Sequence, residues 1–316
     1  MIRKTSSKIT ERIGSVMALM SLGFIFVAFA RNCQEIPPVI WSWLLFTSVL
    51  LSVMASGVTV LLLSYVWWTL LNNVDVELSV SKSFVICGKA QILKYLPGNV
   101  FHLVGRSSLA VREGIPLGIV ISSMTLETIL TVATTALVAL PLVWTRWHDI
   151  SQLINVWDWW KTLFACLVGT LIVVFISRFL RARLQSTGAA LLRMSTRATY
   201  LKAVPSIVLA TLVTGSTFYF FAVSAWPEIT GISVQTCICG LALAWVIGFL
   251  TPGAPGGIGI RELVFLTLFA GSIGDGMAAA LAISFRLLSV IGDIFTFLLA
   301  LVVERFMSPS SHFRVD

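Results

Sequence analysis

Charged side chains interrupt the apolar runs of this sequence at only a few positions. Glu127, Arg286 and Asp293 lie within long runs, and the others lie beside two breaks rich in proline and glycine: Lys94, Arg106, Arg261 and Glu262. A charge at the middle of a membrane costs about 2.5–3.5 kcal/mol on insertion scales, so these side chains are expected to face the protein interior. Guanidinium groups suit phosphate, and carboxylates can balance charge or accept a proton, so these residue types predict binding of a phosphate-bearing group.

The two breaks are KYLPGN at 94–99 and PGAPGGIGIRE at 252–262. A helix that begins after each break would direct unsatisfied N–H groups and a partial positive charge toward the membrane interior, where they form a ready anion site. Glycine there would let a ligand approach the backbone closely. The sequence therefore predicts a substrate-binding region that consists of Lys94, Pro97, Gly98, Arg106, Glu127, Pro255, Gly256, Gly257, Arg261, Glu262, Arg286 and Asp293.

Polar residues at helical spacing accompany the charges in two of the long runs. One stripe consists of Ser123, Glu127, Thr131 and Thr134, and the other of Arg286, Ser289, Asp293 and Thr296. Either the stripes join helices through hydrogen bonds and ion pairs, with Glu127 opposite an arginine, or they line a hydrophilic route for a charged group. Because Ser123, Thr131 and Thr134 continue the polar face beside Glu127, the hydrophilic route is the favoured interpretation, and the joining of helices is the alternative.

The composition defines the class of protein that must position these residues. The chain has 316 residues, of which 57% are hydrophobic and 11% charged, and its mean hydropathy is +0.94. Apolar runs approach or exceed the roughly 20 residues that span a bilayer, and they lie at 13–30, 39–71, 114–142, 162–177, 203–226, 231–250 and 276–303. These features predict an all-α polytopic membrane protein with a single transmembrane domain over 1–316.

Two segments are expected to enter the membrane and return to the same side. In 82–112, basic residues divide two apolar pieces of about a dozen residues each, and neither piece can span alone. A re-entrant hairpin satisfies this pattern if its break lines a cavity. A second hairpin is expected over 231–272, although 231–250 is long enough to span outright as an alternative. The prediction is about six transmembrane helices plus two re-entrant hairpins, with inverted repeats at approximately 39–142 and 203–306, as in transporters.

Basic residues set the expected orientation, because cytoplasmic loops carry an excess of Lys and Arg. Segment 178–202 contains basic residues and no acidic one, so we expect it to be a cytoplasmic linker. The tryptophan-rich segment 144–160 is typical of an aromatic belt and is expected on the outer side, together with 227–230. Both termini are then cytoplasmic, and 13–30 is expected to be a retained helix rather than a signal peptide.

Several classes of function are disfavoured by the sequence. The cysteines and histidines show no metal-ligand spacing, and the chain has neither a P-loop, a complete dinucleotide fingerprint nor a nucleophile elbow. We therefore expect no metal, no cofactor, no nucleic-acid partner and no enzymatic activity.

The order of these motifs resembles a known family. KYLPGNVFHLVGR is followed by a helix that bears Glu127, then by TPGAPGGIGIRE, then by a helix that bears Arg286. This order resembles the lysylphosphatidylglycerol synthase transmembrane family, also called the flippase-like domain family. The resemblance implies a bacterial inner-membrane protein related to the flippase domain of multiple peptide resistance factors, which move aminoacylated phosphatidylglycerol between leaflets. Those proteins also carry a cytosolic aminoacyltransferase domain, whereas this sequence ends at Asp316, so lipid synthesis is not expected of this chain.

The sequence thus predicts a flippase for a phosphate-bearing lipid or a lipid-linked sugar. Arg106, Arg261 and Arg286 are expected to hold the phosphate. One alternative is a partner, without transport activity, that positions an envelope glycosyltransferase, and another is an enzyme that acts on lipid phosphates.

Overall fold

The computed structural model describes residues 39–95, 101–145, 185–251, 257 and 259–307. None of these residues forms a strand, and nearly all of them belong to helices, as the sequence predicts. The helices are α2 (Trp43–Asn72), α3 (Val80–Gln91), the 3₁₀ helix η2 (Ile92–Tyr95), α4 (Phe101–Arg112), α5 (Leu117–Thr145), α8 (Gln185–Met194), α9 (Arg197–Ala225), α10 (Val234–Leu250), α11 (Ile260–Ile273) and α12 (Asp275–Met307).

Within the described ranges, 4 helices are long and apolar enough to cross a membrane, namely α2, α5, α9 and α12. They correspond to the runs predicted at 39–71, 114–142, 203–226 and 276–303. The predicted spans 13–30 and 162–177 lie outside the described residues. Large apolar side chains also point outward along these helices, such as Leu44, which is 70% exposed, and Leu137, which is 63% exposed. The chain is therefore a multi-pass membrane protein.

Local sequence explains where the long helices begin. Ser42 caps α2, because its side chain accepts a hydrogen bond from the backbone N–H of Leu45 at 3.1 Å. Thr196 caps α9 in the same way through Thr199, at 3.2 Å. Such caps satisfy donors that the first turn of a helix leaves free. The apolar runs that follow can then continue as helices across the membrane.

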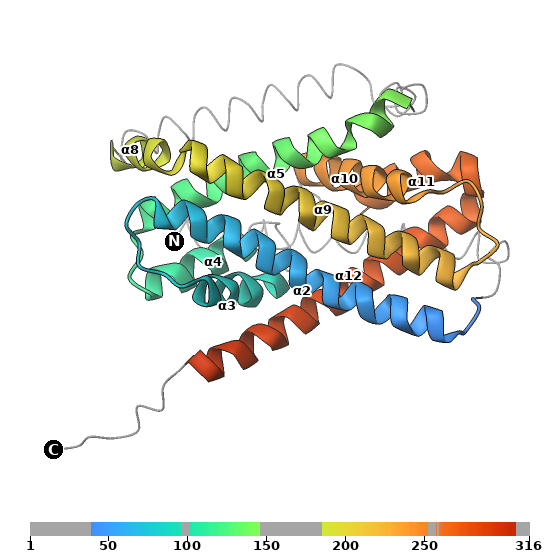
Figure 1. Ribbon diagram of the computed structural model, residues 1–316, viewed down its shortest axis with the longest axis horizontal. Helices are drawn as coiled ribbons and strands as arrows, with labels where there is room; N and C mark the ends of the chain where they lie inside the picture. Colours follow the sequence, from blue (N-terminus) through green and yellow to red (C-terminus); the bar gives the residue numbers. More distant parts are fainter. Residues whose placement is uncertain (1–38, 96–100, 146–184, 252–256, 258, 308–316) are drawn as a thin grey trace, which may run out of the picture.

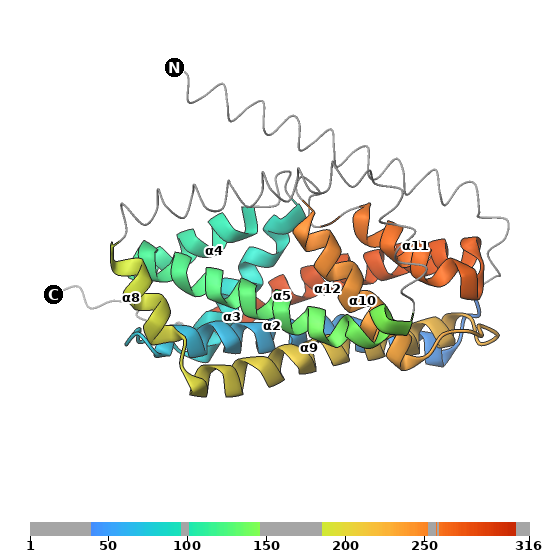
Figure 2. The ribbon, with the colours of Figure 1, turned by 90° about the horizontal axis from the view of Figure 1, so that it is seen from above.

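The helices form an elongated bundle whose long members run along its length (Figure 1). α3, α4 and α8 lie toward one end, and α10 and α11 lie toward the other (Figure 2). α2 packs on α9. α3 contacts α2, α4 and α12, whereas α10 contacts α9, α11 and α5. These partners correspond element by element when α2 to α5 are matched with α9 to α12.

The largest hydrophobic cluster joins α9, α10, α11 and α12. Phe218 of α9 lies at its centre, with ring centroids 5.5 Å from Phe265 and 5.1 Å from Phe285, both in edge-to-face geometry. A second cluster surrounds Trp67 of α2 and includes residues of α3, α4, α5 and α12. The polar residues described next lie between and beside these two clusters.

Candidate functional site

Arg106 and Glu127 form a buried ion pair between α4 and α5. Both guanidinium nitrogens of Arg106 donate to the carboxylate, at 3.2 Å from Nη1 to Oε1 and 2.6 Å from Nη2 to Oε2. Their side chains are only 13% and 10% exposed. A paired, two-pronged contact of this kind is among the strongest that arginine makes. The structure therefore places Glu127 opposite an arginine, as one of the two sequence interpretations expected.

The pair is enclosed by Trp67 and Ser123. The guanidinium carbon of Arg106 lies 4.2 Å from the centroid of the Trp67 ring, and Trp67 itself is fully buried. The indole N–H of Trp67 donates to the hydroxyl of Ser123 at 2.9 Å. A cation over an aromatic face is stabilised when both are removed from water. This cluster joins α2, α4 and α5, and Nε of Arg106 is buried there without a hydrogen bond.

Asp293 of α12 binds the 3₁₀ turn that precedes the first break. The ammonium group of Lys94 lies 2.6 Å from its Oδ2 atom, and the hydroxyl of Tyr95 donates to the same oxygen. Asp293 is buried, whereas Lys94 is partly exposed. Two consecutive residues of η2 are thereby fixed to one carboxylate in a long helix. The predicted break residues Pro97 and Gly98 follow directly and lie outside the described residues.

Arg261 stands at the start of α11 and passes between two glycines. A Cβ atom at Gly248 would lie 2.5 Å from Cγ of Arg261, and one at Gly257 would lie 2.5 Å from its Nε. Gly257 also has a φ of +72°, a backbone conformation that favours glycine. The space beside Gly257 is occupied by the side chain of Arg261, and the approach of a ligand to this glycine stays a prediction. Of the other predicted residues of this break, Pro255 and Gly256 lie outside the described residues.

The guanidinium of Arg261 lacks a partner among the described residues. Its Nε is buried without a hydrogen bond, and no carboxylate of the described ranges forms an ion pair with it. The neighbouring Glu262 is engaged elsewhere, since its Oε2 accepts from the backbone N–H of Gly259 at 2.7 Å and its Oε1 lies 4.0 Å from Nε of Arg286. Arg261 is therefore a buried cation that forms no direct ion pair with a carboxylate of the described ranges.

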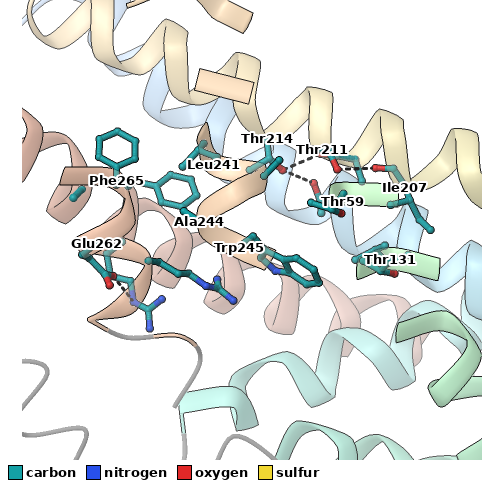
Figure 3. A pocket seen from close by; sticks show the side chains of 18 residues that line it. Thr59, Thr131, Ile207, Thr211, Thr214, Leu241, Ala244, Trp245, Glu262 and Phe265 are labelled. Atoms are coloured by element: carbon teal, nitrogen blue, oxygen red, sulfur yellow. Dashed lines mark hydrogen bonds and ion pairs between the residues drawn. The ribbon is translucent and has the colours of Figure 1, made fainter. Parts of the chain in front are cut away.

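Arg261, Glu262 and Arg286 lie at the edge of a cavity of about 150 Å³ inside the bundle. Figure 3 shows Glu262 on one side of this cavity and a group of threonines on the other, with Trp245 between them. Five threonines line the cavity, and we call four of them, Thr59, Thr131, Thr211 and Thr214, the threonine wall; the fifth is Thr135. A cavity of this size can hold several waters or part of a ligand. Most of its lining is apolar, and polar groups are confined to a few positions. Its two ends differ in chemistry, with charges at one and hydroxyls at the other.

The predicted residues divide into three groups in the structure. Arg261, Glu262 and Arg286 meet at the cavity. Arg106 and Glu127 pair with each other, and Lys94 pairs with Asp293. Among the described residues, no group of three or more His, Cys, Asp or Glu side chains is placed to hold a metal ion.

Sequence reasoning missed most of the threonine wall and Trp245. It found Thr131 from the Glu127 stripe but not Thr211 and Thr214, although these share one face of α9 at a spacing of three residues. Threonine is common in transmembrane helices as packing, so only a search for repeated hydroxyls across several runs could have found the wall.

The fold and this cavity define a multi-pass helical membrane protein with a charged internal site. A family model for the lysylphosphatidylglycerol synthase TM region matches residues 12–299. The chain belongs to this family, which confirms the resemblance found in the sequence. A search of curated proteins found no match to the chain.

Proposed function

We propose that this protein is a flippase that moves a phosphate-bearing lipid, or a lipid-linked sugar, between the leaflets of the bacterial inner membrane. The observation that carries the proposal is Arg261, a cation without a protein partner among the described residues, at the edge of a cavity inside a membrane bundle. An unpaired buried charge is costly, so it persists where a ligand supplies the opposite charge. Phosphate is the anion that a guanidinium fork matches best.

The roles of the site residues follow from their pairing. Arg261 and Arg286 would contact the phosphate, and Glu262 would hold Arg286 while its second oxygen fixes the start of α11. Arg106 is neutralised by Glu127, so we assign this pair to the support of the bundle and not to the phosphate. The acyl chains would remain in the surrounding lipid. We propose that the protein transports its cargo without chemical change.

We also propose that 39–142 and 203–306 are inverted repeats with re-entrant hairpins at α3 to α4 and at α10 to α11. The matched packing of the two groups of helices supports this. The 12 residues of α3 and the 17 of α10 extend about 18 Å and 26 Å, less than the roughly 30 Å hydrocarbon core. An ion pair links the second hairpin helix to the following long helix in both groups, with the signs exchanged. The first pair is Arg106 with Glu127, and the second is Glu262 with Arg286.

The two ends of the bundle differ in a way that supports cytoplasmic termini. Basic residues at the α8 end include Lys82, Arg112, Arg193, Arg197 and Arg305. Exposed tryptophans mark the opposite end, where α2 begins and α5 ends, at Trp41, Trp43 and Trp144. Cytoplasmic loops are rich in Lys and Arg, and tryptophan gathers at membrane interfaces. We therefore propose that the α8 end faces the cytoplasm.

Lipid flipping in proteoliposomes tests the function. Purified protein is reconstituted with a trace of fluorescent phosphatidylglycerol, and the outward-facing fraction is measured by dithionite quenching. Arg261→Gln should lower the flipping rate at least about tenfold, because charge-assisted hydrogen bonds contribute about 1.5–3 kcal/mol. Arg261→Lys keeps the charge but loses the planar fork, so its flipping rate should lie between those of the wild type and Arg261→Gln.

The matched control is Arg112→Gln, the same chemical change at an exposed helix end. It should flip lipid at the wild-type rate. A wild-type rate in Arg261→Gln would remove the phosphate-holding role. If the wild-type protein moves no more lipid than empty liposomes do, the alternative of a partner that positions an envelope glycosyltransferase is favoured instead.

A further inference from the structure

We infer that the lipid cargo carries a neutral, hydroxyl-rich group beyond its phosphate, such as glycerol or a sugar, and no cationic group. This inference rests on the proposed function, since it concerns the cavity at which Arg261 would hold the phosphate. It is carried by the threonine wall opposite the charged end of the cavity.

The hydroxyls of the threonine wall have already used their donors. Thr131, Thr211 and Thr214 donate to backbone carbonyls one turn earlier, at 2.8, 2.9 and 2.9 Å. Thr59 and Thr214 lie 3.2 Å apart, and because Thr214 donates to the backbone, Thr59 must donate to Thr214. A hydroxyl has one donor and two acceptor lone pairs. These four hydroxyls therefore offer acceptors, and a ligand group that meets them must donate, whereas the donor of Thr135 is not accounted for in this way.

The same pattern continues into a smaller neighbouring cavity of about 60 Å³, which shares Thr214 and Phe285 with the first. Its other hydroxyls also donate to backbone carbonyls: Ser52, Ser56, Thr217 and Ser289. The surface of lone pairs thus extends over parts of α2, α9 and α12. Each of these hydroxyls can accept a hydrogen bond from a ligand group that reaches it.

Phosphate cannot satisfy this surface, because its ionised oxygens are acceptors. Alcohols can, since each O–H group supplies the donor that the wall lacks. The two ends of the cavity therefore suit the two parts of one headgroup, with phosphate at Arg261 and a polyol at the threonines. Trp245 lies between the ends and offers an apolar face on which the carbon skeleton of a polyol can rest.

An ammonium group also donates, but the charges of the cavity oppose it. Arg261 and Arg286 contribute two positive charges, and Glu262 is the single carboxylate among the described lining residues. Both oxygens of Glu262 already face positive or donating groups, Gly259 N–H and Arg286. An aminoacylated headgroup would thus bring a cation into a cavity whose described lining is net positive and offers no further carboxylate.

Binding of short-chain lipids to the purified protein tests this inference without requiring transport. Dissociation constants are measured for dioctanoyl forms of phosphatidylglycerol, phosphatidylinositol, phosphatidylethanol and lysylphosphatidylglycerol. Phosphatidylethanol has the same phosphodiester charge as phosphatidylglycerol but no hydroxyl. At least one of the two polyol lipids should bind about fivefold tighter than phosphatidylethanol, the effect of one hydrogen bond. Tighter binding of phosphatidylglycerol would indicate a glycerol group, and tighter binding of phosphatidylinositol a ring-shaped polyol. Lysylphosphatidylglycerol should bind no more tightly than phosphatidylethanol.

Substitutions in the threonine wall test whether its hydroxyls cause the preference for polyol lipids. Valine is similar in size to threonine but has no hydroxyl, so Thr131→Val and Thr211→Val each remove one acceptor. Each should reduce the preference for the polyol lipid and should leave the affinity for phosphatidylethanol within about twofold of the wild-type value. The control is Thr125→Val, because Thr125 makes the same backbone hydrogen bond at 2.8 Å on the exposed face of α5.

Equal affinity for phosphatidylglycerol, phosphatidylinositol and phosphatidylethanol would overturn the inference, and so would tighter binding of the lysyl lipid. If the polyol lipids bind selectively but are not flipped in proteoliposomes, the proposed function fails and the headgroup inference stands. If all the anionic lipids bind with equal affinity and are flipped at equal rates, the headgroup inference fails and the proposed function stands.

Discussion

Replacing Glu127 with glutamine is expected to destabilise the protein strongly, because it leaves Arg106 without its counter-charge. The two side chains make a two-pronged contact and are almost entirely removed from solvent, at 13% and 10% exposed. Glutamine can accept one hydrogen bond from the guanidinium, but its amide N–H₂ would face the second donor. Breaking such a pair costs about 3–5 kcal/mol, which corresponds to a fall in melting temperature on the order of 10 °C.

An ion pair on the surface provides the reference against which the loss of stability in Glu127→Gln is compared. Lys82 and Glu113 lie equally close, at 2.6 Å, but their side chains are 49% and 40% exposed. Water screens such a pair, so Glu113→Gln should cost about 0.2–1 kcal/mol. Both variants are purified in the same detergent, and melting is followed by fluorescence-detected chromatography after heating. Glu127→Gln should melt well below Glu113→Gln.

The double variant Arg106→Met, Glu127→Met separates the loss of the pair from the loss of packing. Replacing both charges with apolar groups removes the stranded cation, and methionine packs well against an aromatic ring such as Trp67. Its melting temperature should recover most of what Glu127→Gln loses. If instead Glu127→Gln melts like Glu113→Gln while lipid flipping falls, Glu127 acts in transport and the supporting role is wrong.

Two further predictions concern Arg261 and topology. A Cβ atom at Gly248 would lie 2.5 Å from Cγ of Arg261 whereas one at Gly271 would meet open space, so Gly248→Ala should slow flipping and lower the free energy of unfolding by about 1–3 kcal/mol. Gly271→Ala should raise it by about 0.5–1 kcal/mol, as chemical denaturation will show. In a cysteine-free background, Leu192→Cys should react with a membrane-impermeant thiol reagent only from the cytoplasm and Glu228→Cys only from outside. The opposite labelling would invert the proposed orientation.

The long helices could be predicted from the sequence because their signal is local. Runs of apolar residues defined α2, α5, α9 and α12 to within several residues, since a membrane helix needs only length and hydropathy. The ends were less well predicted. α9 begins at Arg197 because Thr196 caps it, and α12 continues past Glu304 and Arg305 to Met307, where charged side chains can reach solvent.

The charged residues were identified, but their partners depend on packing. Arg106 and Glu127 are 21 positions apart on different helices, so their contact follows from how α4 lies on α5 and not from any spacing. The same holds for Lys94 and Asp293, which are brought together by the contact of η2 with α12. A sequence shows which side chains need a partner in the membrane, whereas only the fold shows that Arg261 has none among the described residues.

The charge of the cavity lining also bears on the insulation of the membrane. A protein that keeps a cavity with charged groups within a bilayer risks becoming a leak for protons and metal cations, which would dissipate the gradients that the cell maintains. Two guanidiniums against one carboxylate raise the electrostatic energy of any small cation that enters, much as positive groups exclude cations from selective pores. The arrangement that would attract an anionic headgroup would thus also oppose the entry of small cations.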